Sequence, residues 1–288
     1  MSDRSGSASP ASGSDLDIDA ARASEAVFVW APAARCGITL LQRLVSSSRE
    51  ILAFGEMDLL SRRLPAAILE VSAVADESRQ AREQLVAGNY NFWASPALPH
   101  SEMLVDGCIR SFYTLVAAYD RSVQTDGFQR WATKLPSVVP SNTHQIVAKL
   151  LPRSRHVWMT RHVESVMRSY KSRQWLKTIV DVAKVSATWV QSMDQIRQLP
   201  DDGRTLVLRH EELVADPATH VERLRAFLGV ANLDASILEH RVNTFRGEAA
   251  RGHAPDQYIQ PSELSPDERA TMERMVGPHL ERLGYGSR

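Results

Sequence analysis

Short apolar runs alternate along the chain with longer segments of helical periodicity. The runs predict strands at Ala26–Ala31, Glu50–Phe54, Gln129–Lys134, Arg155–Thr160 and Arg204–Arg209. The periodic segments predict helices at Thr39–Ser47, Asp58–Ser72, Ser101–Ser122, Ser141–Leu151, Val163–Lys171 and Thr178–Leu199. Strands that alternate with helices are typical of a parallel sheet covered on both faces. We therefore expect an α/β fold, a single domain with a central, mostly parallel sheet flanked by helices.

Local signals indicate two further helices in the C-terminal part. Asp216–Pro217 supplies an N-cap followed by proline at the first helical position, and Gly229 ends that helix. Ser265–Glu268 reads as a capping box for a last helix, which Gly284 ends. Between these helices, Arg246–Pro261 lacks periodicity and is predicted to be a long loop, a kind of segment that often binds ligands.

The N-terminal residues 1–24 are rich in Ser, Gly, Ala and Asp and lack the pattern of a signal peptide. They predict a disordered leader, so the α/β domain is expected to span residues 25–288. At 288 residues and 43% hydrophobic composition, the chain suffices for one large domain. It shows no internal repeat and no linker between two cores.

Charge and cysteine content narrow the classes of function. Lys plus Arg and Asp plus Glu both number 34, which argues against a non-specific nucleic-acid binder with a basic surface. Two cysteines imply no disulfide framework and suit a reducing compartment. No apolar run approaches the roughly 20 residues that span a bilayer. We expect a soluble, cytoplasmic protein without a membrane span, and the oligomeric state stays open.

The most informative segment follows the first predicted strand. Arg35-Cys36-Gly37-Ile38-Thr39 reads as a turn that opens a helix with Gly-x-Thr. Such a turn aims unpaired backbone N–H groups and the positive helix end at an anion. Compared with a nucleotide triphosphatase P-loop, Ile38 replaces the lysine and Pro32 replaces the first glycine. Residues Arg35–Leu40, here named the anion loop, are therefore suited to a phosphate and poorly equipped for Mg-ATP.

Other charged residues are predicted at the same edge of the sheet. In a parallel sheet the ligand lies beyond the carboxyl ends of the strands. Gly55–Glu56, Lys134, Arg161 and His210–Glu211 follow or end the predicted strands. Together with Arg35 they predict a group of cations around an anion site, with a carboxylate alongside.

These motifs resemble those of the PAPS-dependent sulfotransferase family. Arg35-Cys36-Gly37-Ile38-Thr39-Leu40-Leu41, the anion loop and the residue after it, resembles the R-S-G-T-T-L-L loop for the 5′-phosphosulfate. Arg161 with Ser169 resembles the motif for the 3′-phosphate. Further resemblances, in family order, are Gly55-Glu56, Lys134-Leu135-Pro136, His210-Glu211-Glu212-Leu213 with Asp216-Pro217, Phe227-Leu228-Gly229 and Leu283-Gly284-Tyr285. The resemblance spans about residues 27–285 and implies the P-loop-like sulfotransferase fold.

The resemblance also implies a reaction, a cofactor and residue roles. We expect transfer of a sulfuryl group from PAPS to a hydroxyl of a small-molecule, carbohydrate or peptide acceptor, giving PAP and a sulfate ester. No metal is expected. The catalytic candidates are Glu56, Arg35 and Lys134. The residues expected to bind the cofactor are Arg35, Cys36, Gly37, Ile38, Thr39, Leu40, Arg161, Ser169 and Arg251.

Three positions carry alternatives. Glu56 is the candidate general base, and Asp58 is the fallback. Cys36 replaces the family's serine; it is either a reactive thiol with a lowered pKa or an inert small residue, and we favour the second. His210 replaces the family's tyrosine and is interpreted as structural.

Two other functions compete with sulfuryl transfer. A P-loop kinase-like phosphotransferase is disfavoured by Ile38 in the lysine position. A PAP- or PAPS-binding protein without turnover is the non-enzymatic alternative, because Ile38 and Cys36 depart from the family's loop. The acceptor itself is not identified by any motif.

Overall fold

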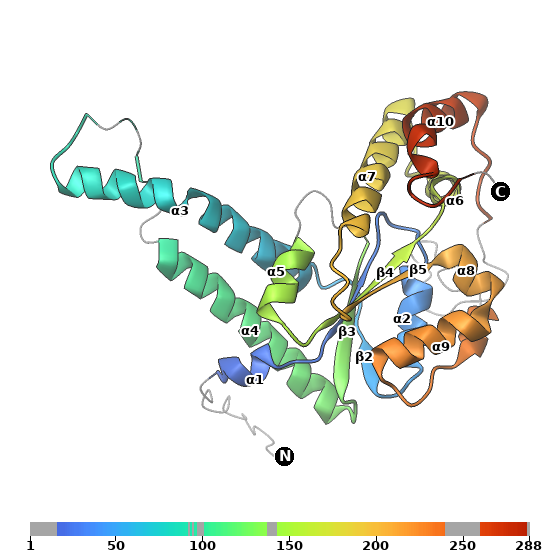
Figure 1. Ribbon diagram of the computed structural model, residues 1–288, viewed down its shortest axis with the longest axis horizontal. Coiled ribbons are helices and arrows are strands. Elements are labelled where there is room, and N and C mark those ends of the chain that lie inside the picture. The colour runs from blue at the N-terminus through green and yellow to red at the C-terminus, as the bar shows by residue number, and fades with distance from the viewer. Residues whose placement is uncertain are drawn as a thin grey trace, which may run out of the picture.

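The computed structural model describes residues 16–91, 93, 95–96, 101–136, 143–239 and 260–286. Its centre is a five-stranded sheet in the order β2-β3-β1-β4-β5, in which every pairing is parallel (Figure 1). The strands are β1 (Val27–Trp30), β2 (Ile51–Ala53), β3 (Arg130–Leu135), β4 (Arg155–Thr160) and β5 (Thr205–Arg209). The predicted parallel α/β sheet is confirmed, and each predicted strand boundary lies within one residue of the observed one.

Helices connect and cover the strands (Figure 1). They are α1 (Ile18–Arg22), α2 (Ile38–Ser46), α3 (Leu64–Val86), α4 (Ser101–Thr125), α5 (Thr143–Leu150), α6 (Val163–Ser172), α7 (Ile179–Arg197), α8 (His210–Ala215), α9 (Pro217–Leu228) and α10 (Pro266–Leu280). A π-helical turn η1 (Leu59–Arg63) precedes α3, and a 3₁₀ turn η2 (Ala235–Glu239) follows α9. Both predicted caps exist: Asp216 accepts the Thr219 N–H, and Ser265 forms a capping box with Glu268. None of the described helices has the length and apolarity to cross a bilayer.

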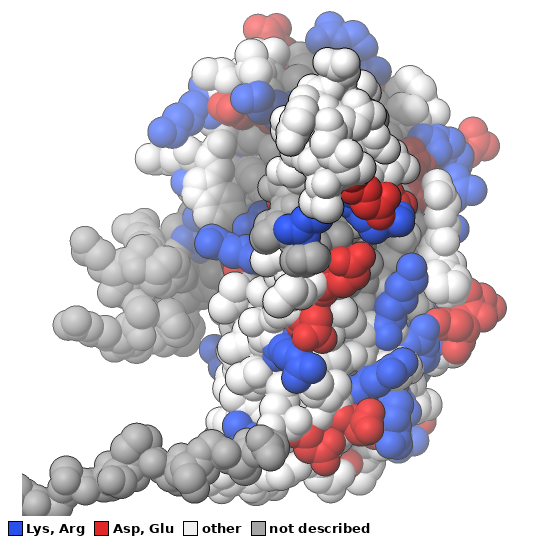
Figure 2. All heavy atoms as spheres, turned by 90° about the vertical axis from the view of Figure 1, so that its left-hand side faces the viewer, with Lys and Arg blue, Asp and Glu red and all other residues white. Residues whose placement is uncertain are grey.

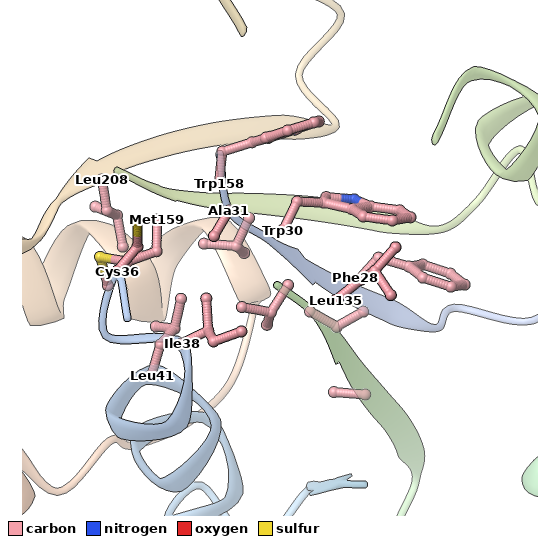
Figure 3. Packing of buried hydrophobic residues seen from close by; sticks show 14 of the residues in the cluster. Phe28, Trp30, Ala31, Cys36, Ile38, Leu41, Leu135, Trp158, Met159 and Leu208 are labelled. Carbon is pink, nitrogen blue, oxygen red and sulfur yellow. The ribbon is translucent and has the colours of Figure 1, made fainter. Parts of the chain in front are cut away.

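The buried strand β1 presents different side chains to the two faces of the sheet. Phe28 and Trp30 point to one face, where their rings stack with each other and with His156. The Trp30 indole N–H donates to His156 Nδ1 over 2.9 Å, so the polar groups among these rings are satisfied. The other face packs against α2, where Leu41 lies below Met159 and Leu208 (Figure 3). Burial on both faces explains why β1 reads as an uninterrupted apolar run.

The order of the strands determines where a ligand site can form. From central β1 the chain crosses to the edge strand β2, whereas from its neighbour β4 the chain continues to β5 on the opposite edge. Connections that diverge in this way leave a crevice beyond the carboxyl ends of the two strands. The anion loop follows β1, and Arg161 follows β4, so both lie at this crevice.

The N-terminal boundary differs from the prediction. Residues 18–22 form α1, although residues 1–24 were expected to be a disordered leader. Asp17 caps this helix by accepting the Ala20 N–H, and Ala21 is buried. The Ser24 hydroxyl donates to Asp120 of α4 over 2.9 Å. One cap and one long-range hydrogen bond thus order a segment whose composition alone favours disorder. Residues 18–22 of the expected leader are therefore helical.

The pair α3 and α4 also differs from the prediction, because α3 continues to Val86 rather than ending near Ser72. The two helices pack side by side and project from the sheet (Figure 1). On the face seen from that side, acidic and basic side chains are interspersed, and neither sign covers it (Figure 2). This view agrees with the balanced charge of the sequence.

We expect the packing of α2 against the sheet to contribute more to the free energy of unfolding than the packing at the end of α3. Leu44 of α2 is fully buried, whereas Leu85 of α3 is 37% exposed. Leu44→Ala should lower the free energy of unfolding by about 2–5 kcal/mol, because it leaves a cavity in a packed core. Leu85→Ala, the matched control, should change it by under about 1 kcal/mol. Urea unfolding of both variants measures the difference, and equal effects would contradict this account of the core.

Candidate active site

Two residues of the anion loop have left-handed backbone conformations. Arg35 has a φ of 68°, and Gly37, at the N-cap of α2, has a φ of 93°. Gly37 makes no side-chain cap, so the first N–H groups of α2 have no capping side chain within the loop. These groups and the positive end of the helix face outward from the turn. The geometry is that of an anion site built from backbone donors.

Apolar contacts hold this turn from beneath. Cys36 points into the core beside Met159, with Ile38 and Leu41 below it (Figure 3). Cys36 is fully buried and Ile38 is 5% exposed. Burial raises the pKa of the Cys36 thiol to about 12, which agrees with the inert thiol that we favoured over the reactive one. Because both side chains face the core, Cys36 and Ile38 can contribute to an anion site only through their N–H groups.

Arg35, Arg161 and Ser169 come together at the crevice. The Arg35 Nε–H donates to the Ser169 hydroxyl over 2.9 Å, and Arg161 Nη1 donates to the Arg35 carbonyl over 3.0 Å. Arg161 Nε is buried and has no partner among the described residues. The Ser169 hydroxyl oxygen accepts the hydrogen bond from Arg35, so the hydroxyl proton can be donated to another acceptor. These groups form a set of hydrogen-bond donors that suits an anion.

Lys134 and Thr39 form a second pair of the same kind. Lys134 Nζ donates to the Thr39 hydroxyl over 2.8 Å, across the gap between the end of β3 and the start of α2. Burial lowers the pKa of Lys134, and the carboxylate of Glu56 opposes this shift. Like Ser169, Thr39 accepts a hydrogen bond from a cation through its hydroxyl oxygen, so its hydroxyl proton can be donated to another acceptor. Both hydroxyls are therefore polarised donors beside the anion loop.

The two candidate bases differ in their surroundings. Glu56 lies just beyond β2, is exposed, and is close enough to Lys134 to affect its pKa. Asp58 pairs with Arg62 and Arg63, each through a guanidinium Nε at 2.6 Å. The hydrogen bond from Arg62 is the largest of the effects that lower the pKa of Asp58. A carboxylate held in this way is a poor proton acceptor, so the surroundings favour Glu56.

His210 packs directly on the anion loop. A Cβ atom added at Gly37 would lie 2.5 Å from His210 Cδ2, so only glycine fits beneath this ring. Burial lowers the pKa of His210 to about 4, and Arg161 acts in the same direction. The ring is therefore neutral at pH 7. These contacts agree with a structural role.

Three further residues support the site, and of these the sequence analysis placed only Glu211 at this edge of the sheet. Tyr170 forms a hydrogen bond with the backbone of Ala34, next to Arg35. Burial raises the pKa of Tyr170 to about 12, and this hydrogen bond opposes the shift. Trp189 of α7 donates its indole N–H to the Arg161 carbonyl over 3.1 Å. Glu211 accepts the N–H of His162 over 2.9 Å and so ties α8 to the end of β4. Tyr170 adjoins Ser169 in the sequence, but nothing in the sequence marks Trp189.

Arg251, the last of the predicted cofactor-binding residues, lies outside the described residues, as does most of the predicted late loop. Within the part of the chain that the structure describes, no group of acids, histidines and cysteines could hold a metal ion.

Comparison with known proteins decides the family. The model of the sulfotransferase family matches residues 28–234, which include the anion loop and all of the sheet except Val27. The chain belongs to the sulfotransferase family. No curated protein matched this sulfotransferase.

Three solved structures are similar to this sulfotransferase at low sequence identity. The sulfotransferase domain of the Synechococcus PCC 7002 olefin synthase is 17% identical, with 88% of this chain and 95% of that one covered and a TM-score of 0.49. A sulfotransferase from Alicyclobacillus acidocaldarius is 17% identical, with coverages of 90% and 94% and a TM-score of 0.45. A retinol dehydratase in a complex with retinol and PAP is 16% identical, with coverages of 89% and 81% and a TM-score of 0.46.

The contact between Gly37 and His210 gives a test of the loop's construction. Gly37→Ala should destabilise this sulfotransferase by about 1–3 kcal/mol, through the left-handed φ and the clash with the ring. Adding His210→Ala should recover part of that loss, because the clash is removed while the φ penalty stays. Urea unfolding of the two single variants and the double variant measures the coupling. Strictly additive effects would mean that the ring does not press on the loop.

Proposed function

We propose that this protein transfers the sulfuryl group of PAPS to a hydroxyl acceptor. The donor set formed by the anion loop, Arg161 and Ser169 carries the proposal. PAPS has a phosphosulfate at one end and a 3′-phosphate on its ribose, so it needs two neighbouring anion sites. Membership of the sulfotransferase family supports this reaction over phosphoryl transfer.

The residues divide between the two anionic ends of the donor. The N–H groups of the anion loop, with Thr39 and Lys134, would hold the phosphosulfate. Arg161 and the Ser169 hydroxyl would hold the 3′-phosphate, and the unpartnered, buried Arg161 Nε is a donor that fits this role. Arg35 lies between the two groups through its bonds to Ser169 and Arg161. Arg251 is proposed to join the 3′-phosphate residues.

In the proposed mechanism each protein group has one task. Bound PAPS supplies a sulfuryl group on a phosphate leaving group. Glu56 takes the proton from the acceptor hydroxyl as its oxygen attacks sulfur in line with the departing phosphate oxygen. Lys134, Arg35 and the loop N–H groups stabilise the charge that develops on the leaving phosphate. The products would be PAP and a sulfate ester, with the proton on Glu56.

The proposed acceptor is a small molecule, a carbohydrate or a peptide with a free hydroxyl, the same classes that the sequence analysis gives. A member of the family that binds PAP without turnover is the competing proposal. The two differ in activity and not in cofactor binding.

The cofactor assignment predicts selective binding of PAP. Calorimetric titration should show that PAP binds and that Mg-ATP binds more weakly, because the loop lacks the P-loop lysine. Arg161→Ala should weaken PAP binding by about tenfold to a hundredfold, the loss expected for a hydrogen bond between charged groups. Arg153→Ala, at the opposite ends of the strands, is the control and should bind PAP normally. Tighter binding of Mg-ATP than of PAP would overturn the assignment.

The base assignment predicts separate effects on binding and turnover. Glu56→Gln should lower the rate of sulfate transfer by about 10²- to 10⁴-fold, the usual contribution of a general base. PAP affinity should be unchanged, because Glu56 is not among the residues proposed to bind the cofactor. Asp58→Asn is the matched control and should keep most of the activity. The assay uses labelled PAPS and a panel of phenols, sugars and tyrosine peptides.

Two results would count against this assignment. Full activity in Glu56→Gln would remove it as the base. PAP binding without transfer to any acceptor in the panel would favour the protein without turnover.

A further inference from the structure

A cavity of about 650 Å³ lies at the amino ends of the strands, opposite the candidate active site. Arg130 and Arg155, the first residues of β3 and β4, both line it. Residues from α1, α4 and the turn after α9 complete the walls, near the lower end of the sheet in Figure 1. Its volume falls within the range of roughly 300–1,000 Å³ that is typical of small-molecule sites.

The two arginines lie side by side at the end of α9. Arg130 Nη1 donates to the Leu228 carbonyl over 2.9 Å, and Arg155 Nη1 donates to the Phe227 carbonyl. These bonds satisfy the last carbonyls of α9, which explains why cations stand here. A guanidinium has five N–H donors, and capping engages one from each arginine. Further donors remain on both groups.

Among the described residues, neither Arg130 nor Arg155 forms an ion pair with a carboxylate. The acids that line the cavity are engaged by other groups: Asp17 by the Ala20 N–H, Glu25 by Arg153, and Asp120 by Ser24 and Trp131. Burial lowers the pKa of Arg130, as does the neighbouring Arg155, whereas the carboxylates of Glu25 and Glu50 oppose this shift. Because the carboxylates of Asp17, Glu25 and Asp120 also line the cavity, the positive charge is local to the half-buried arginine pair.

We propose that this cavity binds a small organic oxyanion, whose phosphate or carboxylate group bridges Arg130 and Arg155. Planar guanidiniums match the paired oxygens of either group, and an anion would offset the repulsion between the two cations. The site is separate from the residues proposed to bind PAPS, and it does not depend on the sulfotransferase mechanism.

Calorimetric titration with pyrophosphate and with citrate tests the proposal and separates phosphate from carboxylate. The full-length Arg35→Ala/Arg161→Ala protein serves as the parent, because it removes the arginines of the candidate active site. At least one of the two probes should bind this parent. Adding Arg130→Gln and Arg155→Gln should weaken that binding by about tenfold or more, the loss expected for charged hydrogen bonds. Arg110→Gln, the control, alters an arginine that is paired with Asp106 outside the cavity and should leave the affinity unchanged.

Binding of neither probe, or equal binding by the Gln variants and the parent, would overturn the proposal. Because the same arginines cap α9, a second measurement avoids substitution. Phenylglyoxal modifies arginines, and mass spectrometry locates the modified residues in the wild-type chain. The bound probe should protect Arg130 and Arg155 at least about threefold more than Arg153, since only the first two would contact it. Equal modification with and without the probe would likewise overturn the site.

Discussion

The burial of Cys36 and Ile38 beneath the anion loop is the constraint on which the candidate active site depends. Both side chains point into the core below the turn, and Gly37 takes the left-handed conformation that reverses the chain between them. With the side chains directed inward, the backbone N–H groups are directed outward. The departures from the family's usual loop are therefore compatible with an intact anion site, because backbone donors do not depend on side-chain identity.

Cations from three separate elements meet above this loop. Arg35 comes from the turn after β1, Lys134 from the end of β3, and Arg161 from the residue after β4. Holding cations in a half-buried crevice costs free energy: burial above all lowers the pKa of Lys134, and the neighbouring Arg35 adds to this shift. Hydroxyls and carbonyls hold these cations in place without cancelling their charge. This arrangement suits the polyanionic cofactor that we propose, since hydrogen bonds within the protein already hold the donors in place.

The sequence predicted the sheet well because buried parallel strands leave an unambiguous signal. All five strands are short apolar runs between helical segments, and the residues after them meet at one edge by the geometry of a parallel sheet. The extension of α3 to Val86 was missed because its second half has charged and polar residues on most faces, with only Ser78 and Ala81 buried. The contact of Trp189 with Arg161 was also missed. It joins residues 28 positions apart through tertiary packing, which no local pattern encodes.

Strands β3 and β4 carry cations at both ends, but the two ends offer an anion different surroundings. At the carboxyl ends, Lys134 and Arg161 act with the N-terminus of α2, whose dipole attracts negative charge. At the amino ends, Arg130 and Arg155 stand beside the C-terminus of α9, whose carbonyls repel it. An anion bound there would receive hydrogen bonds from the two guanidiniums and none from a helix N-terminus. The anion loop, in contrast, keeps its backbone donors when a side chain is removed. Ligand affinity at the amino ends should accordingly depend on arginine identity more steeply than affinity at the anion loop.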